Sequence, residues 1–154
     1  MKAKWAEGIE PRNFVWVIKD SLAICERPGG YGEHHRRVRR QEEIIWIRQH
    51  EFDVLYSLIA GSHNLHNYEE LGMPFRHRPW PAHDRLVHYM EALFIEIHNV
   101  ISAGQKVVVH KEVVEERLCG LMAAYLLWAR LVPTGPQVTA IAERIFQQRL
   151  GPHG

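Results

Sequence analysis

The chain has 154 residues, of which 46% are hydrophobic and 24% are charged, a balance typical of a globular domain and not of a disordered segment. Its 19 lysines and arginines nearly cancel its 18 aspartates and glutamates, and the net charge of +1 therefore argues against nucleic-acid binding. The length is that of a single domain, and we expect one over residues 1–154. The chain has only two cysteines and no hydrophobic run near the roughly 20 residues of a membrane span, so we expect it in the cytoplasm.

The N-terminal part of the sequence predicts two strands and a helix. Residues 13–19 and 21–25 are rich in β-branched and aromatic side chains and are separated by Asp20, so we expect a hairpin with a tight turn. A glycine-rich loop and a basic stretch follow, and isoleucines at helical spacing then indicate an amphipathic helix that ends near His50.

The middle of the sequence predicts two further strands and a long helix. Residues 53–59 are a compact apolar run that predicts a buried strand, and residues 74–77 predict another strand after a short helical piece over 68–72. From Asp84 onward, apolar residues recur at three- and four-residue steps as far as Gly104, a residue typical of a helix C-terminus.

The C-terminal part completes an α/β pattern. The β-branched run over 106–110 predicts the central strand of a parallel sheet. Residues 118–131 are almost all apolar and predict a helix enclosed by protein, and residues 138–146 predict a last amphipathic helix. Because strands alternate with helices, we expect an α/β domain with a mainly parallel central sheet flanked by helices.

The segment over 110–117, between the central strand and the next helix, is where this fold class places its chemistry. It resembles the signature of the cysteine-dependent protein tyrosine phosphatases, His-Cys-x-x-Gly-x-x-Arg-Ser/Thr-Gly, and most closely that of the dual-specificity type. The motif Pro79-Trp80-Pro81 is similar to the loop that holds the general acid of that family. The resemblance extends over almost the whole chain and implies the phosphatase fold.

The signature departs from that family at the residues that carry the reaction. When His110 and Arg117 are aligned with the motif, the nucleophile position falls on Lys111, the loop glycine on Val114 and the hydroxyl residue on Leu118. The family reaction needs a thiolate of lowered pKa and a ring of backbone N–H groups around the phosphate. The sequence therefore predicts a phosphatase-like domain with a degenerate loop and no catalytic cysteine.

Charge in the same loop also argues against oxyanion binding. Glu112, Glu115 and Glu116 place three carboxylates where the family presents an electropositive cradle, and like charges repel at short range. We therefore expect the glutamates to neutralise Lys111 and Arg117, and the loop to stay empty in the presence of phosphate, sulfate or vanadate.

The general acid of the family has two candidate positions. If Pro79-Trp80-Pro81 aligns with the family motif Pro-x-Pro-Asp, Ala82 occupies the acid position, whereas a shift of two residues offers Asp84. The simpler interpretation of Asp84 is a helix N-cap. The resemblance implies that His110 hydrogen-bonds the loop backbone, and Cys119 is expected to be a small buried hydrophobic residue.

The basic stretch over 34–40 is the candidate partner surface, where arginines can hold a phosphate-bearing or acidic ligand. Its four arginines are Arg36, Arg37, Arg39 and Arg40. The simpler interpretation is a solvated helix start whose charge is balanced by Glu33, Glu42 and Glu43.

The 11 histidines do not indicate a metal centre. The pairs His63 with His66 and His83 with His88 have spacings that a turn or a helix can bring together, yet neither pair comes with a cysteine or carboxylate set. We therefore predict no metal and no cofactor.

Two functions are consistent with these observations. The first is a pseudophosphatase, a phosphatase-like binding or scaffolding module for a protein partner or for a second copy of itself. The alternative is an active phosphoric-ester hydrolase that uses an unrecognised nucleophile or a water activated by one of the loop glutamates, Glu112, Glu115 or Glu116.

Overall fold

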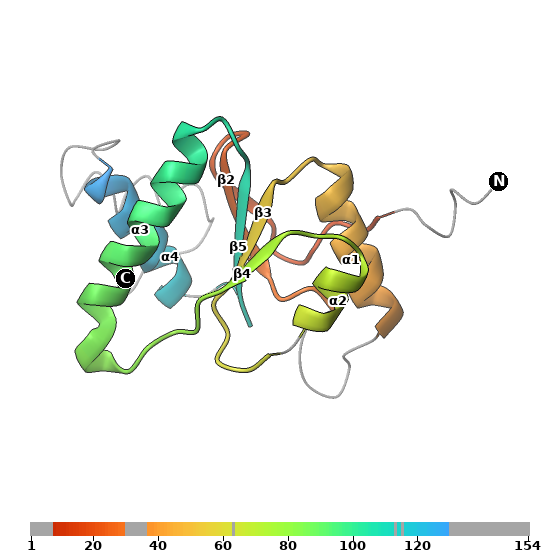
Figure 1. The fold of residues 1–154 in the computed structure, drawn as a ribbon, viewed down its shortest axis with the longest axis horizontal. Helices are drawn as coiled ribbons and strands as arrows, with labels where there is room; N and C mark the ends of the chain where they lie inside the picture. The colour runs from red at the N-terminus through yellow and green to blue at the C-terminus, as the bar shows by residue number, and fades with distance from the viewer. Residues whose placement is uncertain (1–7, 30–36, 63, 113, 115, 130–154) are drawn as a thin grey trace.

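Five strands form one sheet in the order β1-β2-β5-β3-β4. The strands are β1 (Val15–Ile18), β2 (Leu22–Glu26), β3 (Val54–Ser57), β4 (Phe75–His77) and β5 (Val107–Lys111). β1 runs antiparallel to β2, and the other three neighbouring pairs are parallel. The computed structural model describes residues 8–29, 37–62, 64–112, 114 and 116–129, drawn in colour in Figure 1. The predicted α/β class with a mainly parallel sheet is confirmed.

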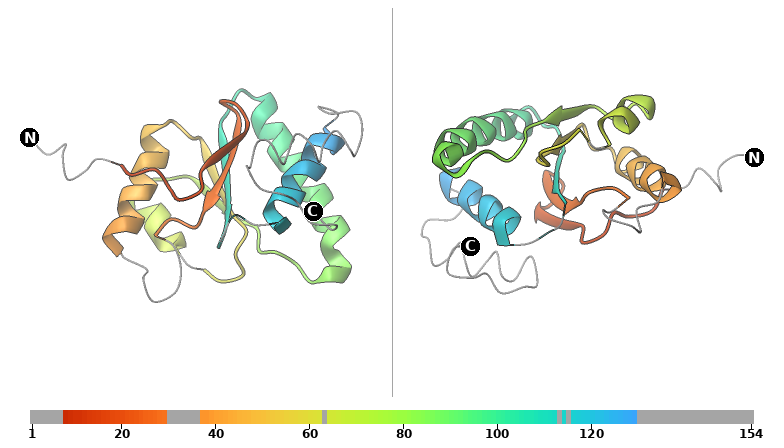
Figure 2. Two further views of the ribbon diagram at one scale, coloured as in Figure 1. Left: turned by 180° about the vertical axis from the view of Figure 1, so that it is seen from behind. Right: turned by 90° about the horizontal axis from the view of Figure 1, so that it is seen from below.

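Helices cover both faces of this sheet. They are α1 (Arg37–Gln49), α2 (Leu65–Glu70), α3 (Leu86–Ser102) and α4 (Glu116–Trp128), with the 3₁₀ helix η2 (His83–Arg85) directly before α3. α1 and α2 lie on one face, and α3 and α4 lie on the other; the views from the front and from below agree on this arrangement (Figure 1, Figure 2).

The alternation of side chains along β5 fills a core on each face. Val107 and Val109 belong to the hydrophobic cluster that includes residues of α3 and α4, whereas Val108 belongs to the cluster with residues of α1 and α2. All three valines are completely buried. A strand covered on both faces needs consecutive apolar residues, and the prediction that 106–110 form the central strand is confirmed.

The short helical piece expected over 68–72 starts and ends earlier in the structure. α2 covers Leu65–Glu70, and Gly72 then adopts a left-handed backbone conformation with a φ of 69°. A positive φ cannot continue a right-handed helix, which explains why the chain turns here towards β4.

The apolar segment predicted over 118–131 is less enclosed than expected. The side chains of α4 from Leu118 to Leu126 are buried or half-buried, but Leu127 and Trp128 are 42% and 40% exposed at the end of the helix. Trp128 lies at the rim of the helix pair, where its ring contacts Phe94 and His98 of α3. No helix in the described part of the chain is long and apolar enough to span a bilayer. The predicted helix over 138–146 lies outside the described residues.

Candidate functional site

The carboxyl ends of three parallel strands meet at one edge of the sheet. Glu26 at the end of β2 is paired with Lys111 at the end of β5, and Ser57 at the end of β3 is paired with His110. The chain segments that leave these strands therefore surround the start of the loop over 112–115. This is the edge at which the sequence predicted the functional site.

Lys111, which the sequence resemblance aligns with the nucleophile, is the last residue of β5 and is only 8% exposed. Its Nζ lies 4.4 Å from the centroid of the Trp80 ring, a distance typical of a cation–π contact. Such a contact stabilises the ammonium form of the lysine. Sequence reasoning missed this partner because Trp80 lies on another segment and had been considered only as part of the acid loop.

Arg117 lies in the first turn of α4 and is exposed. Its expected ion pairs with Glu112 and Glu116 are not formed, and none of the described carboxylates is paired with its guanidinium. Glu115 lies outside the described residues. Arg117 instead lines a pocket of about 670 Å³ between α4 and the segment over 80–90.

The negative charge of Glu112 acts on a different arginine from the one expected. Glu112 is exposed, and its charge affects the ionisation of the buried guanidinium of Arg27. Burial lowers the pKa of Arg27 from its usual value, and the negative charge of Glu112 opposes that shift. The loop after β2 and the loop after β5 are therefore electrostatically linked.

His110 is completely buried and makes two hydrogen bonds. Its Nδ1 is 3.3 Å from the Lys111 carbonyl oxygen, and its Nε2 is 2.8 Å from the Tyr68 hydroxyl. The pKa of His110 is lowered to about 3, mainly by burial; the hydrogen bond to Lys111 opposes this shift, and the nearby charges of Arg27 and His77 add to it. The ring is therefore neutral, with the proton on Nδ1 because the carbonyl oxygen can only accept, and the Tyr68 hydroxyl donates to Nε2. The backbone partner of His110 is therefore the last residue of β5, and the implied contact with the loop itself stays a prediction.

This histidine is part of a chain of hydrogen bonds that joins the loop after β2 to the end of β5. Asn64 Nδ2 donates to the Pro28 carbonyl oxygen at 2.8 Å and lies 3.4 Å from the Tyr68 hydroxyl. Burial raises the pKa of Tyr68 far above its usual value, so its hydroxyl is a permanent donor to His110.

Replacing Tyr68 by phenylalanine tests this chain. We expect Tyr68→Phe to lower the free energy of unfolding by about 1–2 kcal/mol, because His110 Nε2 is left buried without a donor. Urea denaturation measures the change. Tyr125→Phe is the matched control, since Tyr125 is equally buried and its hydroxyl has no hydrogen-bond partner among the described residues; an equal loss in both variants would contradict the prediction.

Two of the four arginines of the basic stretch have partners inside the domain. Arg39 forms an ion pair with Glu43, which is 1% exposed and also accepts the backbone N–H of Gly29 at 2.8 Å. Arg40 Nη1 donates to Asn67 Oδ1 at 2.7 Å. These contacts join α1 to the turn after β2 through Glu43 and to α2 through Arg40. The pairing of Arg39 with Glu43 agrees with the interpretation that the charge of the stretch is balanced by nearby glutamates. Arg37 begins α1, and Arg36 lies outside the described residues.

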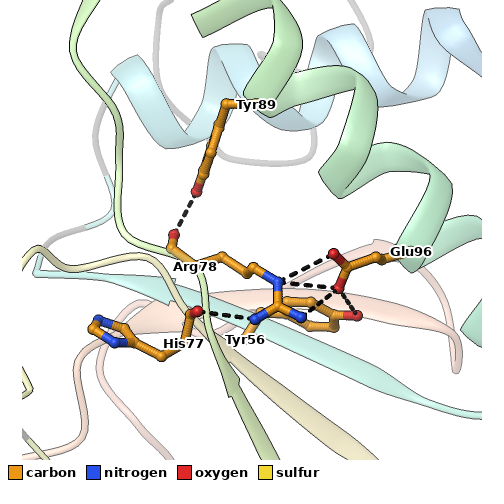
Figure 3. Close-up of polar contacts among 5 residues, drawn as sticks. All are labelled: Tyr56, His77, Arg78, Tyr89 and Glu96. Atoms are coloured by element: carbon orange, nitrogen blue, oxygen red, sulfur yellow. Dashed lines mark hydrogen bonds and ion pairs between the residues drawn. The ribbon is translucent and has the colours of Figure 1, made fainter. Parts of the chain in front are cut away.

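Charged and hydroxyl groups anchor the segment that leaves β4. Arg78 Nε lies 3.2 and 3.1 Å from the two carboxylate oxygens of Glu96 on α3, and the Tyr56 hydroxyl donates to the same carboxylate at 3.2 Å (Figure 3). The Tyr89 hydroxyl donates to the Arg78 carbonyl oxygen at 2.6 Å. These contacts hold the start of the segment over 79–82 between the sheet and α3, which places Trp80 against Lys111.

The two candidate acid positions are both exposed. Ala82 precedes η2 and Asp84 lies within it. Arg85, not Asp84, occupies the N-cap position of α3, and no side chain caps that helix, so the N-cap interpretation of Asp84 is wrong. His83, which lies between the two candidates, lines the pocket beside Arg117. Sequence reasoning had considered His83 only as a metal ligand.

The two cysteines are buried structural residues. Cys119 is completely buried in the core between α4 and the sheet, as predicted. Cys25 of β2 is paired with His110 of the neighbouring strand β5, and burial raises the pKa of the Cys25 thiol well above the usual value. Neither residue supplies an exposed thiolate. Within the described residues, no three histidine, cysteine, aspartate or glutamate side chains gather into a metal-binding group.

Solved structures with similar folds are phosphatases or phosphatase-like proteins. A kinase-associated phosphatase with its catalytic cysteine replaced by serine has 16% identity, a TM-score of 0.74, and alignment over 91% of this chain and 87% of its own. Human DUSP28 has 14% identity and a TM-score of 0.64, and the alignment covers 93% of this chain and 89% of that protein's chain. The human tyrosine phosphatase-like serine/threonine/tyrosine-interacting protein has 11% identity and a TM-score of 0.66, and the alignment covers 91% of this chain and 89% of that protein's chain. No protein-family model and no curated protein sequence matches the chain.

Proposed function

We propose that this chain, which has the fold of the dual-specificity and tyrosine phosphatases, is a pseudophosphatase that serves as a cytoplasmic binding or scaffolding module. The observation that carries the proposal is the buried side chain of Lys111, whose Nζ lies 4.4 Å from the centroid of the Trp80 ring, at the end of the central strand where the family places its thiolate. Its partner is a protein or a second copy of the chain.

The chemistry of Lys111 argues against covalent catalysis. An amine must lose its proton before it can attack phosphorus, and a cation–π contact favours the protonated form. The residue aligned with the hydroxyl that helps to release the intermediate is Leu118, which is completely buried in the hydrophobic core. Neither step of the family reaction therefore has a suitable side chain.

Activity assays with the purified chain test this proposal. We expect no hydrolysis of p-nitrophenyl phosphate, of a phosphotyrosine peptide or of a phosphothreonine peptide above the buffer rate. Turnover that is lost in Glu112→Gln or Glu115→Gln, and kept in the exposed control Glu91→Gln, would overturn the proposal in favour of a hydrolase that activates water. Trapping of a phosphorylated form of the protein would overturn it equally.

The basic stretch is the proposed partner-binding surface of the module. Because Arg39 and Arg40 contact Glu43 and Asn67, we assign the contact with an acidic or phosphate-bearing ligand mainly to Arg36 and Arg37. We expect Arg36→Gln/Arg37→Gln to weaken binding of a labelled polyglutamate peptide, measured by fluorescence anisotropy, by about tenfold. Arg12→Gln/Arg48→Gln, a pair of exposed arginines elsewhere, should leave the affinity unchanged; equal weakening by both pairs would contradict the assignment.

A further inference from the structure

The pocket beside Arg117 has the size and lining of a small-molecule site. Its volume is about 670 Å³, within the range of roughly 300–1,000 Å³ that is usual for ligand pockets. Trp80 and Pro81 line it from the segment after β4, and residues of the first turns of α4 line it as well. Because Arg117 and Trp80 belong to the segments that resemble the phosphatase signature and acid loop, the inference rests on the proposed absence of phosphatase chemistry there.

The lining of this pocket changes from charged to apolar along α4. Glu116 and Arg117 contribute from the first turn of the helix, and Gly120, Leu121 and Ala124 contribute from the following turns. Leu86 and Met90 of α3 add further apolar surface to the pocket. A ligand that fits this gradient has a polar head at the start of α4 and an apolar body along the helix.

Both charged groups at the head end are available to a ligand. Glu116 and Arg117 are exposed, and neither forms an ion pair with another residue in the described part of the chain. A head group with only a negative charge would be attracted by Arg117 and repelled by Glu116. A head group with only a positive charge would be attracted by Glu116 and repelled by Arg117. A head group that carries both charges turns both interactions into attraction.

We propose that this pocket binds a small zwitterion with an apolar body, the chemical class of a free α-amino acid with an aromatic or long aliphatic side chain. Arg117 binds the carboxylate, Glu116 binds the ammonium group, and Leu86, Met90, Leu121 and Trp80 surround the apolar body.

Three ligands with the same phenyl body test the proposal on the full chain at neutral pH. They are L-phenylalanine, 3-phenylpropionate, which lacks the ammonium group, and 2-phenylethylamine, which lacks the carboxylate. Calorimetry should give a Kd for L-phenylalanine about two- to fivefold lower than for either singly charged compound, because each exposed ion pair is weak. The indole N–H signal of Trp80, identified by its loss in Trp80→Phe, should shift on binding.

Substitutions at the two charges should each remove one preference. Arg117→Gln should abolish the advantage of L-phenylalanine over 2-phenylethylamine and keep its advantage over 3-phenylpropionate, and Glu116→Gln should do the reverse. Arg85→Gln, an exposed arginine of η2, is the matched control and should change neither ratio. Equal affinity for all three compounds, or no binding of L-phenylalanine at millimolar concentration, would overturn the proposal.

Discussion

Acidification from pH 6.5 to about pH 5 is expected to cost the protein about 2 kcal/mol of folding stability through His110 alone. The pKa of this buried imidazole is lowered from 6.5 to about 3, so between these values the unfolded chain binds a proton that the folded chain does not. Stability therefore rises with pH across this window, by about 1.4 kcal/mol per pH unit, and is lost as the pH falls below 6.5.

Urea denaturation at a series of pH values measures this dependence, and His110→Gln should remove the part that belongs to the imidazole. The variant should be less stable than the parent at pH 7, because a close-packed hydrogen-bonded ring is lost, but the difference between the two should shrink as the pH falls. His98→Gln, which removes an exposed histidine of α3, is the control and should keep the slope of the parent. An unchanged slope in His110→Gln would contradict the assignment.

Removal of the buried carboxylate of Glu43 is the second change with a large expected effect. We expect Glu43→Ala to lower the free energy of unfolding by about 2–3 kcal/mol. The loss leaves the N–H of Gly29 without its acceptor and Arg39 without its ion pair. This expected loss of stability is small for a buried ion pair, because Arg39 is about one third exposed and water can solvate its guanidinium when Glu43 is removed.

Two further variants separate the parts of this effect. Glu42→Ala, at the neighbouring position of α1, changes helix propensity by the same amount without touching Gly29 and should cost less than about 1 kcal/mol. Glu43→Gln keeps an acceptor for the Gly29 N–H and should fall between the two. Equal losses from Glu42→Ala and Glu43→Ala, measured by chemical denaturation, would show that the buried carboxylate has no special role.

The architecture was predictable because it depends on patterns that are local in the sequence. The β-branched run over 106–110 can be buried on both faces only as a central strand, and the apolar spacing after Asp84 matches the buried face of α3. The extent of exposure at Trp128 was not predictable, since it depends on where α4 extends past its neighbours.

The sequence by itself determined the fold class and the lysine at the end of β5, because these follow from periodicity and residue identity. Only the tertiary structure decided the partners of the charged residues: Lys111 with Trp80, Glu112 near Arg27, and Arg117 at a pocket with Glu116. The physical reason is that electrostatic attraction acts through space between any charges that folding brings close, whatever their separation in the sequence. Neighbours in the sequence, such as Glu116 and Arg117, do not face each other on a helix and so need not pair.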